Sequence, residues 1–482
     1  EAYPVIANVK VDRPVLDFKI ANEDLLGLLP PPPNQEFDVF GPTTWDADAY
    51  AKSFEKFEYR QPSDFFKDFP DLCKWADMQW YKHFWYLNDT RVVHITATEK
   101  NQDSTPAFPK HCIYPTEADF LEDQGWGPYV REFARVDAGA KPAVLWYLFM
   151  KKEILKSEKI DAGDIRQILC ADPIYARIGA CFEQHQNVLM KQRCEDSSGQ
   201  CGWSPFNGGF QRLMHRLEKE GCSYVEFDWT RFDGTIPPKL FMHIKRLRWS
   251  LINKNQRSRY AHMYKWYCHN LINRYVLLPS GEITRQTRGN PSGQISTTMD
   301  NNMVNYWLQA FEFAYFHGCD DELWAQYDTV VYGDDRLTRM PKVPHNYVER
   351  VVQMYADVFG MWVKPEKVKV SNTLVGLTFC GFEIGPNYMP FPAQPYKLMA
   401  GLLKPARVLP DLDALHGKLL SYQVLMHNAP KDHPFKEYIE TCLARVAELD
   451  SSDLPARFTE EQLDRLWRGG PRELGWRYGQ GP

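Results

Sequence analysis

The most informative segment of this chain is Thr329-Val330-Val331-Tyr332-Gly333-Asp334-Asp335-Arg336-Leu337-Thr338. Its β-branched and apolar residues predict two strands joined by a tight turn, where Gly and Asp are favoured. Two adjacent carboxylates, Asp334 and Asp335, then lie at that turn. Neighbouring carboxylates repel one another unless a cation neutralises them, and hard oxygen ligands favour Mg²⁺ or Mn²⁺. A lone Gly-Asp-Asp is more often an ordinary exposed turn, so its interpretation depends on the rest of the chain.

A second acidic pair lies upstream, in Tyr224-Val225-Glu226-Phe227-Asp228-Trp229-Thr230-Arg231-Phe232-Asp233. Apolar residues alternate with a polar one before Asp228, which predicts a half-buried strand that ends there. Asp233 follows after a further turn. Because ligands usually bind at the strand ends of open sheets, we expect Asp228 and Asp334 to meet across neighbouring strands.

This arrangement suits phosphoryl transfer. Carboxylates from two strands can bridge two cations about 3.5–4 Å apart, which activate a 3′-hydroxyl and stabilise the leaving pyrophosphate. We therefore predict Asp228 and Asp334 as the principal metal ligands. Asp335 is predicted as an auxiliary ligand, and the Trp229 backbone carbonyl as a further oxygen donor. Mg²⁺ is the expected cofactor, with Mn²⁺ as the alternative.

Three other segments fit a nucleotide site. Residues 288–302 form a Gly/Pro/Ser loop that leads into a predicted helix, where hydroxyl and amide groups can bond sugar or phosphate oxygens. Residues 151–166 mix cations with short apolar steps; they are either a solvated amphipathic face or a basic strap over a triphosphate. Residues 364–367, Lys-Pro-Glu-Lys, offer a further cation or proton donor.

The order of these segments resembles the viral RNA-dependent RNA polymerases of positive-strand RNA viruses. The shared order is a basic strap, Asp-x₄-Asp, Pro-Ser-Gly-x₃-Thr, Tyr-Gly-Asp-Asp, a Lys-bearing turn and Leu377-Thr378-Phe379-Cys380-Gly381-Phe382, all within residues 151–384. Residues 227–238, FDWTRFDGTIPP, are similar to the astrovirus polymerases. The resemblance implies an RNA-directed RNA polymerase, a nucleotidyltransferase that replicates a viral genome by adding nucleotides from NTPs to an RNA 3′-end.

The resemblance also implies residue roles at the sugar. Asp228 and Asp334 fall on the metal-binding aspartates of the family, with Asp335 beside them. Asp233, Ser292 and Asn301 match the positions that hydrogen-bond the incoming ribose, and Thr297 matches the Thr of the same loop. Such a polar group favours a 2′-hydroxyl, because buried groups are left unpaired when deoxyribose binds.

Cationic roles follow in the same way. Lys151, Lys159 and Arg166 match the basic strap around template and triphosphate, and Lys367 matches the proposed general acid for pyrophosphate, with Lys364 close enough to compete for that role.

Two positions depart from the family pattern. Cys380-Gly381 stands where the primer-gripping turn often carries a cation, and Lys152 where many relatives have an acid.

The implied fold is an α+β right-hand polymerase with fingers, an antiparallel palm and a small helical thumb. The predicted boundaries are fingers over 1–185 with the N-terminal segment, palm over 186–236 and 286–392, a fingers insertion over 237–285 and thumb over 393–482. Apolar residues at three-to-four spacing between Leu412 and Val446 predict amphipathic helices in the thumb.

Composition limits where RNA can bind. The 482 residues carry a net charge of −5, so RNA contacts are expected in a confined electropositive channel. Residues 243–248 and 257–259 are candidates for its lining, or else solvated helix faces. Eleven cysteines without paired CxxC spacing indicate a reducing compartment. The apolar run near Ala143–Met150 is too short to span a bilayer.

Partners and location come from the resemblance. RNA template, nascent RNA and NTPs are the implied partners, and a small thumb resembles relatives that start from a genome-linked protein primer. The implied location is the host cytoplasm, at membrane-associated replication complexes. Three alternatives stay open at this point. A reverse transcriptase would prefer dNTPs, a metal-dependent nuclease would cut RNA without NTPs, and an RNA-binding protein would lack turnover.

Overall fold

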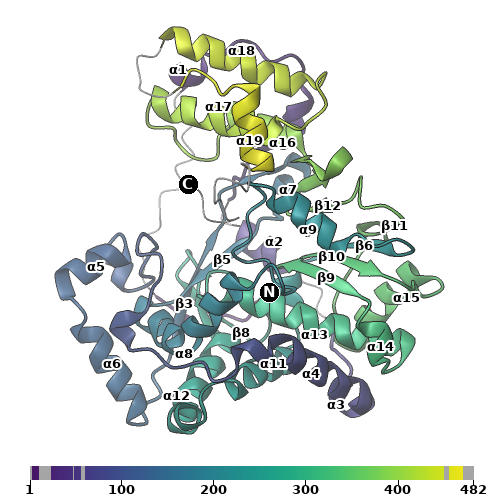
Figure 1. Cartoon of the computed structure of the whole chain (residues 1–482). Coiled ribbons are helices and arrows are strands. Elements are labelled where there is room, and N and C mark those ends of the chain that lie inside the picture. Colours follow the sequence, from purple (N-terminus) through teal and green to yellow (C-terminus); the bar gives the residue numbers. More distant parts are fainter. Residues whose placement is uncertain (1–2, 10–22, 47, 56–59, 450–454, 470–482) are drawn as a thin grey trace.

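The computed structural model describes residues 3–9, 23–46, 48–55, 60–449 and 455–469. Figure 1 shows a helical lobe at the top, a sheet with its helices at the right, and a larger, mainly helical region at the lower left. Helices and mainly antiparallel sheets are mixed throughout, with β3 (Leu145–Met150) and β7 (Arg274–Leu277) as a parallel pair of strands, in agreement with the predicted α+β class. Among the described residues, no helix has the length and apolar character needed to cross a bilayer.

The central sheet has four antiparallel strands in the order β11-β6-β10-β9. The predicted hairpin consists of β9 (Asp328–Tyr332) and β10 (Asp335–Met340), and β6 (Ser223–Asp228) pairs with β10. On its other side β6 pairs with β11 (Val368–Ser371). The long helix α13 (Thr297–His317) packs against β9 and against α4 (Pro70–Phe84). The end of β6 and the hairpin turn therefore lie at one edge of the sheet.

A second sheet lies in the lower-left region, in the order β1-β8-β7-β3-β5. Its strands are β1 (Ala7–Asn8), β8 (Glu282–Gln286), β7 (Arg274–Leu277), β3 (Leu145–Met150) and β5 (Gln167–Cys170). The helices of this region include α6 (Gly127–Asp137), α8 (Pro173–Gln192) and α12 (Lys254–Ile272). Buried Trp146 of β3 and Trp307 of α13 belong to one continuous apolar core, so the two regions share their interior.

The top lobe consists of α16 (Pro395–Leu403), α17 (Leu412–Met426), α18 (Pro434–Leu449) and α19 (Glu460–Arg468). Leu415 and Leu419 of α17 are buried in its core, as their helical spacing predicts. Phe37 and Phe40 join the same core, and β2 (Phe40–Pro42) pairs with β4 (Ile154–Lys156). The N-terminal segment thus connects the thumb helices to the strap. Below the lobe lies a small sheet of β12 (Thr378–Phe379), β13 (Phe382–Ile384) and β14 (Pro390–Pro392).

The remaining α-helices lie around these regions. They are α1 (Glu23–Leu26), α2 (Ala49–Glu55), α3 (Phe65–Asp68), α5 (Glu117–Gln124), α7 (Ser157–Asp161), α9 (Gly209–Leu217), α10 (Phe232–Thr235), α11 (Pro238–Ser250), α14 (Asp321–Trp324) and α15 (Tyr347–Met354).

A buried ionic cluster joins the helices α8, α11 and α13. Lys245 and Arg248 of α11 each form ion pairs with Glu183 of α8 and Asp300 of α13, at 2.6–3.5 Å. Although burial alone would raise it, Arg248 and Lys245 lower the pKa of Glu183 to about 2. Since Asp300 lies in the first turn of α13 and Ser296 donates to Glu183 at 2.9 Å, the cluster fixes the loop that enters α13.

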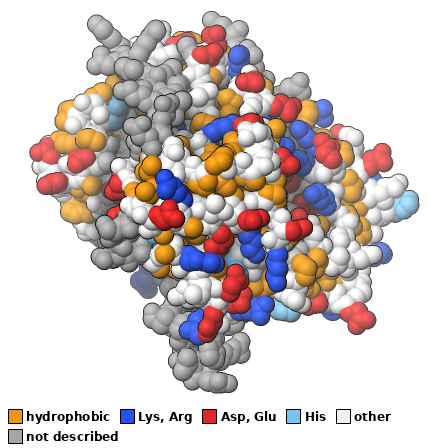
Figure 2. All heavy atoms as spheres, turned by 90° about the horizontal axis from the view of Figure 1, so that it is seen from above, with side chains coloured by type: hydrophobic (Ala, Val, Ile, Leu, Met, Phe, Trp, Pro, Cys, Tyr) orange, Lys and Arg blue, Asp and Glu red, His pale blue; other side chains and the backbone are white. Residues whose placement is uncertain are grey.

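This cluster corrects one prediction. Residues 243–248 were candidates for an RNA channel, but Lys245 and Arg248 are fully buried and neutralise carboxylates inside the protein. Arg259, in the other candidate segment, pairs with Asp137 at 2.6 Å instead. Figure 2 shows acidic and basic side chains interspersed over the described part of the upper face. Lys245, Arg248 and Arg259 are therefore engaged in ion pairs within the protein. The exposed Arg246 and the basic strap stay candidates for the channel lining.

Candidate active site

Three aspartates meet at the edge of the central sheet. Asp335 is the cross-strand partner of Asp228 on one side and of Tyr332 on the other. Asp334 follows Gly333 in a two-residue turn, and Gly333 has a φ of +61°, a conformation that favours glycine. The sequence predicted both Asp334 and Asp335 on the turn. The structure instead begins β10 at Asp335, directly opposite Asp228, with Asp334 beside the pair.

Mutual repulsion shows in the pKa values of these groups. Burial, followed by the charges of Asp334, Asp228 and Glu226, raises the pKa of Asp335 to about 7. Burial and the charge of Asp228 also raise the pKa of Asp334. Near neutral pH the Asp335 carboxyl therefore tends to retain a proton unless positive charge is supplied.

Helix α13 holds the hairpin turn in place. The Gly333 N–H donates to Asn302 Oδ1 at 2.8 Å, and Asn305 Nδ2 donates to the Gly333 carbonyl at 3.5 Å. Both asparagines are fully buried. The sequence did not predict a role for either residue. The pattern that could have indicated one is a pair of polar side chains one helical turn apart in α13, since buried polar groups need partners.

The predicted ribose-binding residues lie beside the aspartates. Asn301 Nδ2 donates to Asp233 Oδ1 at 2.7 Å, and Asn290 Nδ2 donates to Asn301 Oδ1 at 2.9 Å. Burial, with the nearby charge of Asp334, raises the pKa of Asp233 to about 6. Asp233 is thus close enough to the metal-ligand candidates to respond to their charge.

The other two predicted residues of this loop, Ser292 and Thr297, make hydrogen bonds that fix the conformation and position of the loop. Thr297 donates from its hydroxyl towards the Pro291 and Gln294 carbonyls, at 3.1 and 3.0 Å. The Ser292 carbonyl accepts from the Leu169 N–H at 2.8 Å, which ties the loop to β5. Thr297 therefore positions the loop, and Ser292 lies half-buried where the loop meets β5.

The basic strap contains an internal carboxylate. The Arg166 guanidinium donates hydrogen bonds from two nitrogens to the Glu153 carboxylate, with a shortest distance of 2.7 Å. Lys151 lies 3.4 Å from the same carboxylate. Against the effect of burial, the charges of Glu153, Asp334 and Asp233 raise the pKa of Arg166. Arg166 thus lies between Glu153 and the aspartates. Lys152 stands where many relatives have an acidic residue, and here the next residue, Glu153, supplies that acid.

Two further lysines accompany the strap. Lys159 lies exposed on the short helix α7. Lys397 of the thumb helix α16 was not predicted; burial and the charges of Arg166, Lys159 and Lys151 lower its pKa, opposed by Glu153. Because α16 also packs on β4, this cluster of cations spans the strap and the thumb.

Lys367 and Cys380 flank the aspartates. Lys367 Nζ lies 3.8 Å from Asp228 Oδ2, with both side chains about half exposed, so the structure favours Lys367 over Lys364 as the cation at this end. Cys380 lies in the turn between β12 and β13, at a φ of +52°. Burial and the charges of Asp335 and Asp334 raise the pKa of its thiol. That turn therefore presents a neutral thiol where relatives often present a cation.

Comparison with known proteins identifies the family. Residues 131–392, more than half of the chain, match the family model described as viral RNA-dependent RNA polymerase. The chain belongs to this family. This polymerase is 62% identical over 473 residues to the non-structural polyprotein 1AB of human astrovirus 5, and 52% identical over 484 residues to that of ovine astrovirus 1. The alignments cover 98% of the chain but only 33% and 36% of those polyproteins, so the chain spans about a third of these relatives.

A solved structure confirms the fold of the polymerase. The Sicinivirus 3Dpol RNA dependent RNA polymerase matches with a TM-score of 0.72, covering 96% of this chain and 98% of that one, at 15% sequence identity. The predicted family is therefore confirmed by the family model, and the predicted right-hand fold by the solved structure. The domain boundaries and the roles of individual site residues stay predictions.

The donor set of the polymerase fits a hard divalent cation. Among the described residues, no three acidic, histidine or cysteine side chains are already drawn together as a metal site. However, Asp228, Asp334 and Asp335 offer only carboxylate oxygens, and the raised pKa values of Asp334 and Asp335 show a local excess of negative charge. These three residues, with the backbone carbonyl of Trp229, are the groups that would hold Mg²⁺ or Mn²⁺.

Proposed function

We propose that this chain copies a positive-strand RNA virus genome by template-directed transfer of nucleotides from NTPs to an RNA 3′-end, with a two-metal mechanism. The observation that carries the proposal is the pairing of Asp228 with Asp335 beside Asp334, with the ribose-facing pair of Asp233 and Asn301 next to them. An enzyme that binds both metal ions and a nucleoside sugar needs the two groups together.

Each group has a stated task in this proposal. When bound, divalent cations supply Lewis-acid stabilisation of the attacking and leaving oxygens. Arg166 and Lys151 bind the triphosphate, because both already point at a carboxylate that a phosphate can replace. Asp233, held by Asn301, accepts a hydrogen bond from the ribose 2′-hydroxyl. Lys367, at the same end, donates a proton to the departing pyrophosphate.

Partners and location extend the proposal. RNA template, nascent RNA and NTPs follow from the chemistry of the family. A genome-linked protein primer and membrane-associated replication complexes in the host cytoplasm follow from analogy to relatives with a small thumb. The primer proposal predicts that a nucleotidylated protein increases initiation; efficient initiation on an unprimed template, with no gain from that protein, would contradict it.

Primer extension on a homopolymeric RNA template with Mg²⁺ or Mn²⁺ tests the central proposal. Asp334→Asn removes one metal-ligand charge and should reduce extension at least about 100-fold, since metal-based stabilisation amounts to several kcal/mol. Asp432→Asn, at an exposed position in the thumb, should extend like wild type. Wild-type extension by Asp334→Asn would refute the assignment.

The same assay separates the alternatives. Preference for dNTPs would indicate a reverse transcriptase, and RNA cleavage without NTPs would indicate a nuclease. RNA binding without turnover would indicate a binding protein. The polymerase proposal expects NTP-dependent extension alone.

A further inference from the structure

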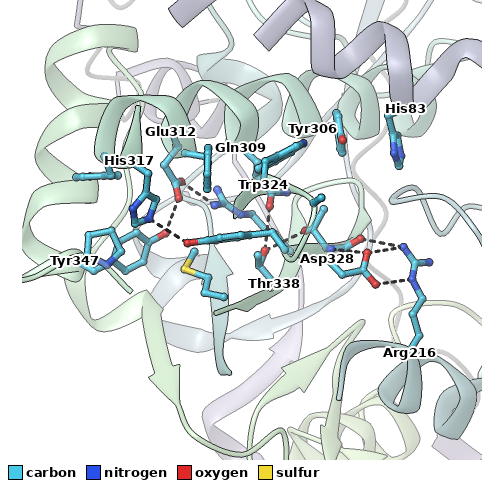
Figure 3. Close-up of a pocket in the computed structure, with 18 of the residues that line it drawn as sticks. His83, Arg216, Tyr306, Gln309, Glu312, His317, Trp324, Asp328, Thr338 and Tyr347 are labelled. Atoms are coloured by element: carbon cyan, nitrogen blue, oxygen red, sulfur yellow. Dashed lines mark hydrogen bonds and ion pairs between the residues drawn. The ribbon is translucent and has the colours of Figure 1, made fainter. Parts of the chain in front are cut away.

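A cavity of about 230 Å³ lies between the central sheet and α13, and none of the active-site residues described above lines it. Its walls come from α13, β9, β10 and α14, together with His83 of α4 and Arg216 of α9. Figure 3 shows Glu312, His317 and Tyr347 gathered at one end and the Arg216–Asp328 pair at the other.

The ionised groups of the cavity largely cancel in pairs. Arg216 binds Asp328 at 2.9 Å, and Arg336 binds Glu312 at 2.7 Å. Burial lowers the pKa of His83 to about 3 and lowers that of His317, so both rings are neutral near pH 7. The remaining ionised lining residue is Asp196, which is exposed. The interior therefore suits a ligand without net charge, because an ion would lose its hydration without gaining a counter-ion.

Aromatic side chains line the interior. The aromatic residues at the cavity are Tyr306, Phe313, Phe316, Trp324, Tyr327 and Tyr347. Arg336 Nε is buried and has no hydrogen-bond partner among the described residues. The Tyr327 hydroxyl donates to the Lys342 carbonyl at 2.5 Å, so it accepts from His317 Nε2 at 3.0 Å, and His317 Nδ1 is left as an acceptor. The cavity thus offers aromatic rings and, at His317, one acceptor.

A chain of hydrogen bonds connects the cavity to the catalytic turn. Thr338 and Gln309 both line the cavity, and the Thr338 hydroxyl donates to Gln309 Oε1 at 3.0 Å. Gln309 Nε2 donates to Asn305 Oδ1 at 3.3 Å, and Asn305 donates in turn to the Gly333 carbonyl at 3.5 Å. A molecule that shifts Gln309 would therefore move the support of the turn that carries Asp334.

We propose that this cavity is a regulatory binding site for a neutral, flat heteroaromatic molecule of about nucleobase size, whose occupancy changes the rate of nucleotide addition. The size follows from the volume, which is below the range of about 300–1,000 Å³ typical of drug-sized ligands. The aromatic walls favour a ligand with a flat ring. The paired ions of the lining favour a ligand without net charge. The rate effect acts through Gln309 and Asn305, which are positioning residues for the turn.

Binding is tested first, without reference to activity. Adenine, a natural base, and quinoxaline, a synthetic bicycle, are titrated into the full chain by ligand-observed NMR. Ala325 is exposed at the cavity, so Ala325→Tyr should block it with little effect on folding, and Ala325→Ser is the matched control. We expect millimolar or tighter binding of at least one probe, weakened at least tenfold by Ala325→Tyr alone. No binding of either probe, or equal binding to both variants, would overturn the site.

The effect on catalysis is tested with Gln309→Met, which keeps the volume of the side chain and removes its hydrogen bonds. A saturating probe should change the wild-type extension rate at least twofold and leave the Gln309→Met rate unchanged, while binding stays within twofold. A bound probe without effect on wild type would overturn the regulatory role. If Ala325→Tyr lowers the melting temperature, a crystal soaked with quinoxaline decides: density in the cavity supports the site, and density only elsewhere refutes it.

Discussion

Replacing Asp335 by Asn should stabilise the protein at pH 8 when divalent ions are absent. The pKa of this carboxyl is about 7 in the folded chain against an ordinary 3.8. At about 1.36 kcal/mol per pKa unit, this difference corresponds to about 4 kcal/mol. Because the carboxyl is partly open to water, screening reduces the effect, and we expect about 1–2 kcal/mol. Asn keeps the shape of the side chain and removes the charge that Asp334, Asp228 and Glu226 repel.

The pH dependence has a definite sign. Below pH 4 the carboxyl is protonated in both the folded and unfolded chain, so Asp335→Asn should change little. Between pH 4 and 7 only the unfolded chain ionises at this residue, and wild-type stability falls as pH rises. Above pH 7 the difference in the free energy of unfolding between wild type and variant keeps its full value.

Differential scanning fluorimetry across pH 4–8 measures this effect. Wild type should gain more from added Mg²⁺ at pH 8 than Asp335→Asn does, because the cation relieves repulsion that the variant lacks. Asp432→Asn, at an exposed thumb position, should follow wild type at every pH. A variant that is less stable than wild type at pH 8 without Mg²⁺ would refute the repulsion between these carboxylates.

Three further predictions concern residues around the turn. Asn302→Ala frees the Gly333 N–H and should lower kcat about tenfold with little change in the KM for NTP; unchanged kcat in steady-state kinetics would contradict it. Asn301→Ala removes a donor to the Asp233 carboxylate, which we propose binds the ribose, and should reduce the preference for NTP over dNTP about tenfold in single-nucleotide incorporation; an unchanged ratio would count against it. Asp300→Asn leaves buried Lys245 short of negative charge and should lower the free energy of unfolding by about 3–5 kcal/mol in denaturant titrations; a loss below about 1 kcal/mol would argue against the cluster.

The sequence predicts the parts of the site that are local. Alternating apolar residues identify β6 and its end at Asp228, and the Gly-Asp turn identifies the hairpin, because both depend on short-range rules. The cross-strand register was not predicted: Asp335 is the residue paired with Asp228. That register depends on which of two adjacent aspartates begins β10, and cross-strand pairing decides it.

Long-range packing accounts for what the sequence did not predict. Lys245 and Arg248 look like surface cations in the sequence, yet they neutralise carboxylates of two other helices. Lys397 lies outside every motif and reaches the strap only because α16 packs on β4. Glu153, between Lys151 and Arg166, is recognisable as their partner only once β3, β4 and β5 are placed.

The central claim is that Asp228, Asp334 and Asp335 together hold divalent cations. Crystals of the polymerase grown with Mn²⁺ and a non-hydrolysable NTP, measured for anomalous scattering, test it most directly. The account predicts anomalous peaks within coordination distance of Asp228 and of at least one aspartate of the hairpin, about 2.0–2.3 Å from the carboxylate oxygens, with the triphosphate on the same ions. Ordered triphosphate with no anomalous peak at these carboxylates, or Mn²⁺ bound only elsewhere, would contradict it.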